Sequence, residues 1–231
     1  MKIVFTPDWF ASFDIFIELF SFIILFLFFF LAMRNFKLSR NKNSFYLGLG
    51  FFLIALAEIF TILTKVVLYY DSTFTQNVGQ MIVTYNVVKS VDIFYYIGFF
   101  LHKLFTLAGF YIIYKIPTRK GTAGDFILAI SFLIISSLFS NTFYYVFHLT
   151  ALLLIFLIIM NYQEIYKKNK SENTKLLIIS FVLLAFSQMM FILSQFGVIY
   201  VAAQIIQLIS YIILLLLIIR ITKHGQKKKP Y

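Results

Sequence analysis

The chain has 231 residues, of which 61% are hydrophobic and 13% are charged, whereas soluble proteins average about 45–50% and about 25%. It contains 31 Phe and 15 Tyr residues, and a soluble fold of this size could not cover so much apolar surface with so few charges. The composition therefore indicates an integral membrane protein. It excludes a soluble enzyme, a disordered chain and, because cysteine is absent, a disulfide-stapled domain or a zinc–cysteine site.

Seven stretches are apolar enough to cross about 30 Å of hydrocarbon, which takes roughly 20 residues in a helix. In chain order they cover residues 10–33, 45–70, 93–114, 123–140, 143–162, 176–196 and 198–221. The fourth is the shortest and is expected to form a tight helical hairpin with the fifth across Asn141 and Thr142. Gly197 suits a sharp turn between the sixth and the seventh. The expected fold is an all-α membrane protein, a seven-transmembrane helix bundle that forms one transmembrane domain over residues 1–231.

The distribution of lysine and arginine predicts the orientation of this bundle. The connections after the first, third and fifth spans and the tail after the seventh carry most of the basic residues: Arg34, Lys37, Arg40, Lys42, Lys115, Arg119, Lys120, Lys167, Lys168, Lys170, Lys175, Arg220, Lys223, Lys227, Lys228 and Lys229. The other side has only Lys2 and Lys89. Basic connections stay in the cytoplasm, so we expect the N-terminus outside the cell membrane and the C-terminus in the cytoplasm. The net charge of +11 is then explained by the membrane topology and by attraction of the basic residues to anionic lipids, so no nucleic-acid partner is expected.

The longest connection, Asp71–Val91, lies outside the cell in this orientation. We expect its second half to form a short helix or a hairpin at the membrane interface. Long outer connections often serve as lids or binding segments, and the alternative is a spacer that rests on the rim of the bundle.

Polar side chains within the spans supply the candidate site residues. An ionisable group inside a membrane costs several kcal/mol, so it should face the bundle interior and find a partner. The candidate ligand-binding residues are Glu58, His102, Gln204 and Gln207, followed by Glu18, Lys65, His148 and Gln188. Most of them fall between the middle of the membrane and its outer face, while the inner half is rich in Leu, Ile and Phe. This pattern predicts a polar cavity that opens to the outside.

A purely structural interpretation of the same residues remains open. Ser and Gln side chains commonly join helices inside membranes, and Glu18, Glu58, Lys65 and Lys103 could form ion pairs within a packed bundle.

The favoured function is that of a receptor-like, sensory or accessory membrane protein that binds a small ligand or partner and is not an enzyme. Besides the lipid bilayer, its expected partners are a membrane protein or a second copy of the chain. The N-out seven-helix plan is similar to that of rhodopsins and of prokaryotic seven-helix sensor domains, in topology only. A retinal protein needs a lysine in the middle of the seventh span, where this chain has Ala203–Gln207, so covalent retinal is not expected.

Two alternative functions remain. In a transporter, Glu18 and Glu58 would carry protons or cations, although the inner half is apolar, no span interior contains proline and no internal repeat is evident. In a haem protein, His102 and His148 would be the axial ligands, because they are the only histidines within spans, and electron transfer would follow. No metal site is predicted, because Glu58, His102 and His148 lie in three different spans rather than at ligand spacing along one helix.

Overall fold

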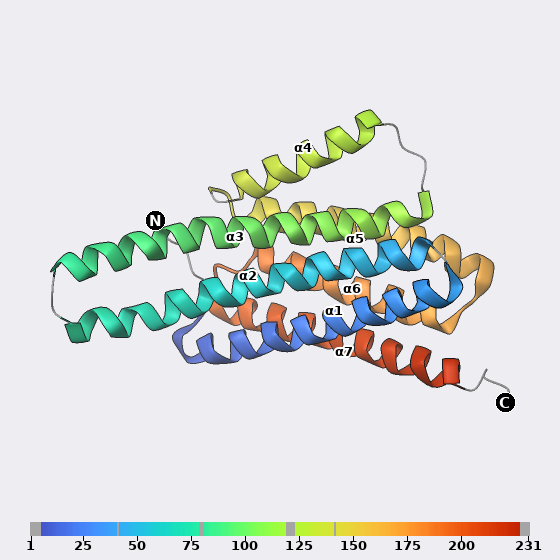
Figure 1. Cartoon of the computed structure of the whole chain (residues 1–231), viewed down its shortest axis with the longest axis horizontal. Helices are drawn as coiled ribbons and strands as arrows, with labels where there is room; N and C mark the ends of the chain where they lie inside the picture. Colours follow the sequence, from blue (N-terminus) through green and yellow to red (C-terminus); the bar gives the residue numbers. More distant parts are fainter. Residues whose placement is uncertain (1–5, 41, 79–80, 119–122, 141, 227–231) are drawn as a thin grey trace.

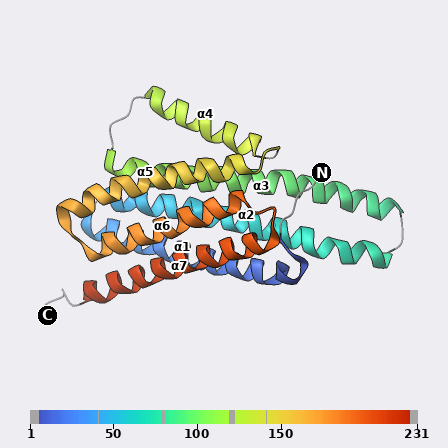
Figure 2. The same ribbon diagram turned by 180° about the vertical axis from the view of Figure 1, so that it is seen from behind.

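The computed structural model describes residues 6–40, 42–78, 81–118, 123–140 and 142–226, and over these ranges it contains helices and turns but no strand. A 3-10 helix, Asp8–Phe10, precedes seven α-helices: α1 (Ala11–Ser39), α2 (Lys42–Val78), α3 (Met81–Thr118), α4 (Ala123–Phe139), α5 (Tyr145–Asn169), α6 (Glu172–Ile192) and α7 (Gly197–Gln226). Figures 1 and 2 show them running lengthwise in one elongated bundle. The predicted all-α bundle of seven helices is confirmed.

Six of these helices are long and apolar enough to span a membrane, and α4 is shorter. Its 17 residues reach the lower limit of what a spanning helix needs, in agreement with the prediction that the fourth span is the shortest. Figure 1 shows α4 on the outside of the bundle, where it packs against α3 and α5. The chain is thus a multi-pass helical membrane protein whose other six helices form the body of the bundle.

The prediction of a long connection over Asp71–Val91 is wrong, whereas the helix that was one of two forms predicted for its second half is present as the start of α3. α2 continues to Val78 and α3 begins at Met81, so the two helices extend together beyond the rest of the bundle (Figures 1 and 2). The physical reason lies in the segment's composition, because between Asp71 and Val91 there is no proline and the only glycine is Gly79, so nothing forces the helices to stop earlier. Residues 79–80 lie outside the described part of the chain.

The C-terminal ends of α1, α3, α5 and α7 lie at one end of the bundle, which we call the basic end (Figure 1). Two helices close there with left-handed residues, Arg40 at φ 54° and Lys170 at φ 46°. Their backbone N–H groups donate to the carbonyl oxygens of Phe36 and Tyr166, both in the preceding turn, which satisfies acceptors that the helix leaves unpaired. The cationic side chains also suit the negative pole of a helix C-terminus.

The sequence assigns most basic residues to the cytoplasmic side. Those that lie in the described part of the chain are all at the basic end: Arg34, Lys37, Arg40, Lys42, Lys115, Lys167, Lys168, Lys170, Lys175 and Arg220. Arg119, Lys120 and Lys227–Lys229 lie outside the described residues, as does Lys2 on the opposite side. The side chains of Lys89 and Lys223 are likewise not described. The orientation of the bundle in the membrane therefore stays a prediction.

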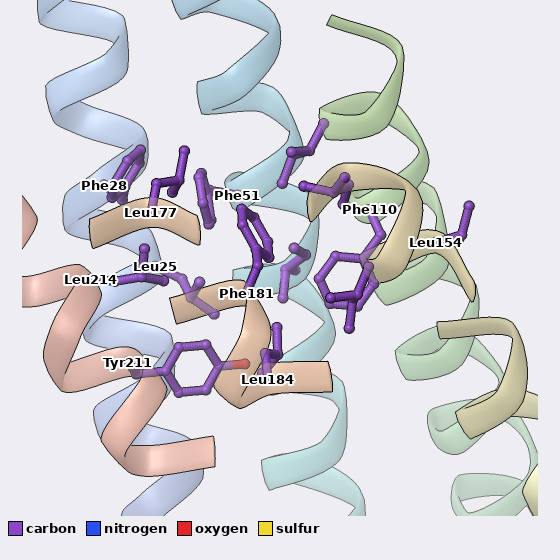
Figure 3. Close-up of a cluster of buried hydrophobic side chains, with 14 of the residues drawn as sticks. Leu25, Phe28, Phe51, Phe110, Leu154, Leu177, Phe181, Leu184, Tyr211 and Leu214 are labelled. Atoms are coloured by element: carbon purple, nitrogen blue, oxygen red, sulfur yellow. The ribbon is translucent and has the colours of Figure 1, made fainter. Parts of the chain in front are cut away.

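A cluster of apolar side chains packs between the helices, mostly toward the basic end, and Figure 3 shows part of it in close-up. Phe51, Phe110 and Phe181 are among its largest fully buried members, and the Phe51 and Phe181 rings stack with 6.5 Å between their centroids. Inside a membrane such close contact, rather than the hydrophobic effect, holds helices together. We call this cluster the apolar core.

Paired serines join α6 to α7 within this core. The Ser180 and Ser210 hydroxyl oxygens lie 3.0 Å apart, and the Ser210 hydroxyl also donates to the Ser180 carbonyl oxygen at 2.9 Å. Both side chains are buried, so no water competes for these hydrogen bonds.

We expect a coupling free energy of about 0.6 kcal/mol between Ser180 and Ser210, the average for interhelical hydrogen bonds inside membranes. Unfolding of Ser180→Ala, Ser210→Ala and the double variant in mixed micelles would measure it as a double-mutant cycle. Ser131→Ala on the exposed face of α4 is the control. Strict additivity of the two changes would show that the pair does not stabilise the α6–α7 contact.

Candidate ligand-binding site

A cavity of about 220 Å³, which we call the helix cavity, lies among α1, α2, α3, α5, α6 and α7. One water molecule needs only about 10–15 Å³ by this measure, so the space holds a small organic molecule or several waters. All eight candidate residues predicted from the sequence line it: Glu18, Glu58, Lys65, His102, His148, Gln188, Gln204 and Gln207. The structure therefore brings together side chains that come from six different helices.

The helix cavity lies in the half of the bundle away from the basic end. Toward that far end its lining includes Tyr95 of α3 and residues before α1 and in the α4–α5 and α6–α7 connections: Thr6, Ser140, Thr142, Tyr144 and Ser194. Its floor is formed by Ile54, Phe110 and Leu184, which also belong to the apolar core. The cavity is thus a pocket that is polar toward the far end of the bundle and apolar toward the basic end.

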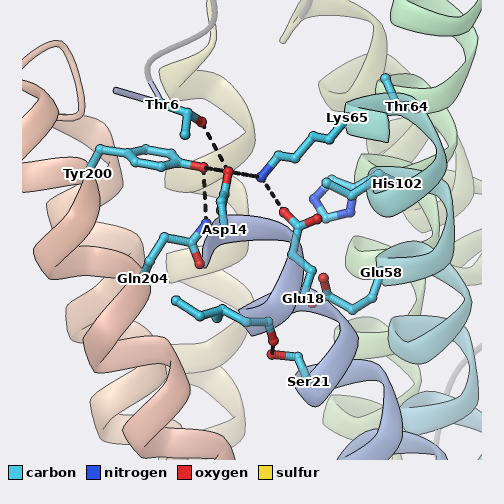
Figure 4. A network of polar contacts seen from close by, with 12 residues as sticks. Thr6, Asp14, Glu18, Ser21, Glu58, Thr64, Lys65, His102, Tyr200 and Gln204 are labelled. Carbon is cyan, nitrogen blue, oxygen red and sulfur yellow. Dashed lines mark hydrogen bonds and ion pairs between the residues drawn. The ribbon is translucent and has the colours of Figure 1, made fainter. Parts of the chain in front are cut away.

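Lys65 is the centre of the charged network in this pocket (Figure 4). Its ammonium group lies 2.6 Å from Asp14 Oδ2, forms an ion pair with the Glu18 carboxylate and donates to the Tyr200 hydroxyl at 3.2 Å. The three N–H donors of a lysine are matched here by three oxygens. The network joins α2 to α1 and α7, and Lys65 is paired with Asp14 and Glu18 rather than with Glu58.

Tyr200 extends the network along α7. Its hydroxyl donates to Asp14 Oδ2 at 2.9 Å and accepts a hydrogen bond from Gln204 Nε2 at 3.1 Å. The Thr6 hydroxyl donates to the same Asp14 oxygen at 3.1 Å. Asp14 is completely buried, so these donors replace the water that its carboxylate would otherwise bind.

Glu58 occupies a different position from Glu18, although both are almost fully buried. The Tyr211 hydroxyl donates to Glu58 Oε1 at 3.4 Å, and Gln207 Nε2 donates to the Tyr211 oxygen at 3.3 Å. Among the described residues, the ion pairs do not include Glu58. Its carboxylate is therefore held by a neutral chain of hydrogen bonds.

The two histidines are oriented through their Nδ1 atoms. His102 Nδ1 lies 3.2 Å from the Ala57 carbonyl oxygen, and His148 Nδ1 lies 2.8 Å from Gln188 Oε1. Both partners are acceptors, so each Nδ1 carries the proton, and in a neutral ring Nε2 is then an acceptor. The Phe147 ring contacts both imidazoles, with centroids 5.7 Å and 5.0 Å away.

The haem hypothesis stays a prediction, which an absorption spectrum of the oxidised and reduced protein tests directly. Within the described residues, no three His, Cys, Asp or Glu side chains are grouped so that they could hold a metal ion.

Three residues that line the cavity each carry a buried polar atom without a hydrogen-bond partner within the described structure: Glu18 Oε2, Gln204 Oε1 and Thr106 Oγ1. Glu18 and Gln204 are each 5% exposed. A buried polar atom without a partner is costly, so its presence in a residue that lines a cavity indicates that something else, water or a ligand, supplies the missing contact.

Asp14 and Tyr200 were not among the candidate site residues, although each lies on a polar stripe in the sequence. Asp14 precedes Glu18 by four residues and Tyr200 precedes Gln204 by four, so each pair shares a helix face. Their importance depends on α1 and α7 packing side by side, and the sequence gives no sign of which helices are neighbours.

The comparisons of this chain with protein-family models, with curated proteins and with solved structures found no match. The function is therefore argued from the geometry and chemistry of the helix cavity.

Proposed function

We propose that this protein is a receptor-like or accessory membrane protein that binds a small ligand in the helix cavity. The observation that carries the proposal is the convergence of polar side chains from six helices on one space, whose lining includes Glu18 and Gln204, each with a buried oxygen that has no hydrogen-bond partner in the described structure. Ligand sites in proteins are mostly apolar concavities with a few convergent polar groups, and the aromatic and polar lining of this cavity fits that description.

The shape of the site favours binding over passage. On the side of the basic end, the described residues that line the cavity are Ile54, Phe110 and Leu184. From there the apolar core continues toward the basic end. A transport path needs polar groups or broken helices at depth, and α1, α2 and α3 are continuous through this region.

We place the cavity mouth on the outer side of the cell membrane, in keeping with the basic residues at the opposite end. Binding at the far end of the bundle would alter the packing of α1, α2 and α7, which Lys65 joins, and a membrane partner or a second copy would respond to that change.

The absence of cysteine makes this proposal directly testable. We expect Thr106→Cys, on the cavity wall, to react with a charged, membrane-impermeant thiol reagent added to intact cells. Ser180→Cys, which is also buried (2% exposed, against 8% for Thr106) but sits in the apolar core between α6 and α7, should stay unreactive. Lys37→Cys at the basic end should react only after the cells are permeabilised.

A ligand of the cavity should slow modification of Thr106→Cys and leave that of Lys37→Cys unchanged. If Thr106→Cys is as unreactive as Ser180→Cys, the cavity is closed to solvent and the proposal is wrong. If Lys37→Cys is the variant that reacts in intact cells, the orientation is inverted.

Transport is the second candidate, favoured by one observation. Glu18 and Glu58 both line the helix cavity together with His102, and acidic groups inside membranes often mark paths for protons or cations. Proteoliposomes loaded with a pH-sensitive dye would reveal proton flux, which we expect to be absent. A flux that Glu58→Gln abolishes would favour transport instead.

A further inference from the structure

The hydrogen-bonding groups of the helix cavity are unequally divided between donors and acceptors. The Lys65 ammonium is used by Asp14, Glu18 and Tyr200, and the Lys103 ammonium donates to the Ser140 carbonyl oxygen at 3.1 Å. Of the three partnerless atoms, those of Glu18 and Gln204 are acceptors, and the Thr106 hydroxyl can either donate or accept. A molecule that completes this site has to bring N–H or O–H donors.

The imidazoles and amides point to the same conclusion. With Nδ1 of His102 and His148 donating to Ala57 and Gln188 oxygens, the Nε2 atoms of the neutral rings are acceptors as well. The cavity therefore offers carboxylate, amide and imidazole acceptors to whatever occupies it.

With every carboxyl and ammonium group ionised, the charges of the site would be out of balance by one. Asp14, Glu18 and Glu58 are three acidic groups, whereas Lys65 and Lys103 are two cations. Glu58 takes no part in the ion pairs of the described residues, and its carboxylate repels that of Glu18. Because a buried charge without a counter-charge is costly in a membrane, one further positive charge between these two carboxyl groups would stabilise the site.

We propose that the ligand of the helix cavity is a small organic cation whose single ammonium group docks between Glu18 and Glu58. This inference rests on the proposed function and names the ligand class. A metal ion is a poorer occupant, because the described residues lack a three-ligand group and the space is far larger than one ion. The rest of the ligand packs on Phe99, Phe147 and Phe191, and aromatic faces attract cations in addition.

The test uses three probes that share one phenyl-ethyl frame and differ in charge: phenethylamine (cation), 2-phenylethanol (neutral) and phenylacetate (anion). Each is added to the purified full-length protein at neutral pH, and thermal unfolding is followed. We expect phenethylamine alone to raise the melting temperature and to slow modification of Thr106→Cys.

Glu58→Gln is the decisive variant, because the amide keeps an oxygen that accepts from Tyr211 and removes only the negative charge. We expect it to weaken phenethylamine binding by about tenfold or more, since a charged hydrogen bond is lost. Glu164→Gln, at an exposed carboxylate near the basic end, should bind phenethylamine like the unmodified protein.

The other outcomes overturn the inference in distinguishable ways. Equal stabilisation by 2-phenylethanol or phenylacetate would show that the cavity binds ligands without selecting a cation, and the proposed function would stand. If no probe binds but the melting temperature depends on pH in the unmodified protein and not in Glu58→Gln, the missing positive charge is a proton. An unreactive Thr106→Cys would remove the proposed function itself.

Discussion

Replacing Lys65 by methionine is expected to destabilise the bundle by about 3–5 kcal/mol, the usual cost of breaking a buried ion pair from one side. Methionine retains most of the length of the side chain but strands the carboxylates of Asp14 and Glu18, which are buried and lie against Lys65. Unfolding in mixed micelles at neutral pH measures the loss. The loss should shrink as the pH falls, because protonation of the carboxyl groups removes the stranded negative charges.

Two controls separate this electrostatic effect from packing. Lys37→Met, at an exposed site on α1, should leave stability nearly unchanged. Adding Asp14→Asn and Glu18→Gln to Lys65→Met should recover most of the loss, since a neutral network of similar shape is often as stable as the ionic one. If the triple variant is as unstable as Lys65→Met alone, the ion pairs are not what holds α1 against α2.

Gly109→Ala is expected to cost about 1–3 kcal/mol, the range for overpacking a close-packed interior. α2 and α3 have the most extensive contact in the bundle, and they approach closely where Gly50 faces Gly109. A Cβ atom at position 109 would lie 2.7 Å from the Gly50 carbonyl oxygen and 2.5 Å from Ile54 Cγ1. A backbone oxygen cannot rotate away, so the two helices would have to separate.

Gly48→Ala is the matched control for that variant. Its Cβ would meet the Ala32 methyl group at 3.0 Å and the nearest backbone oxygen, that of Phe29, at 3.5 Å, so a small shift of α1 would accommodate it. Unfolding of both variants under the same conditions should show a clearly larger loss for Gly109→Ala. Equal losses would mean that close approach of α2 and α3 is not specifically required.

The sequence predicted the class and the helices because both depend on local composition. Runs of Phe, Leu and Ile long enough to cross a bilayer define α1, α2, α3, α5, α6 and α7, and the short fourth stretch gave the short α4. The helix ends were less predictable. No breaker marks where α2 and α3 stop, and the expected connection over Asp71–Val91 proved to be helical up to Val78 and from Met81.

The eight candidate site residues could be found because polar groups are rare in apolar spans, and their depth placed them in the same half of the bundle. Which of these residues form ion pairs or hydrogen bonds with each other could not be predicted, because that depends on which helices are neighbours. The sequence left open whether Lys65 pairs with Glu18 or with Glu58. Packing of α1 against both α2 and α7 places Asp14, Glu18 and Tyr200 around the Lys65 ammonium.

By itself, then, the sequence determined that the chain is a helical membrane protein with polar groups in one half of its bundle, since hydropathy along the chain is enough for that. Only the tertiary structure decided that Lys65 forms ion pairs with Asp14 and Glu18 and that Glu58 accepts a hydrogen bond from the Tyr211 hydroxyl. The physical reason is that a membrane interior forces each polar group to find a partner but does not specify the partner. That choice follows from the close approaches between helices, such as the one at Gly50 and Gly109, which fix the side chains that can reach each other.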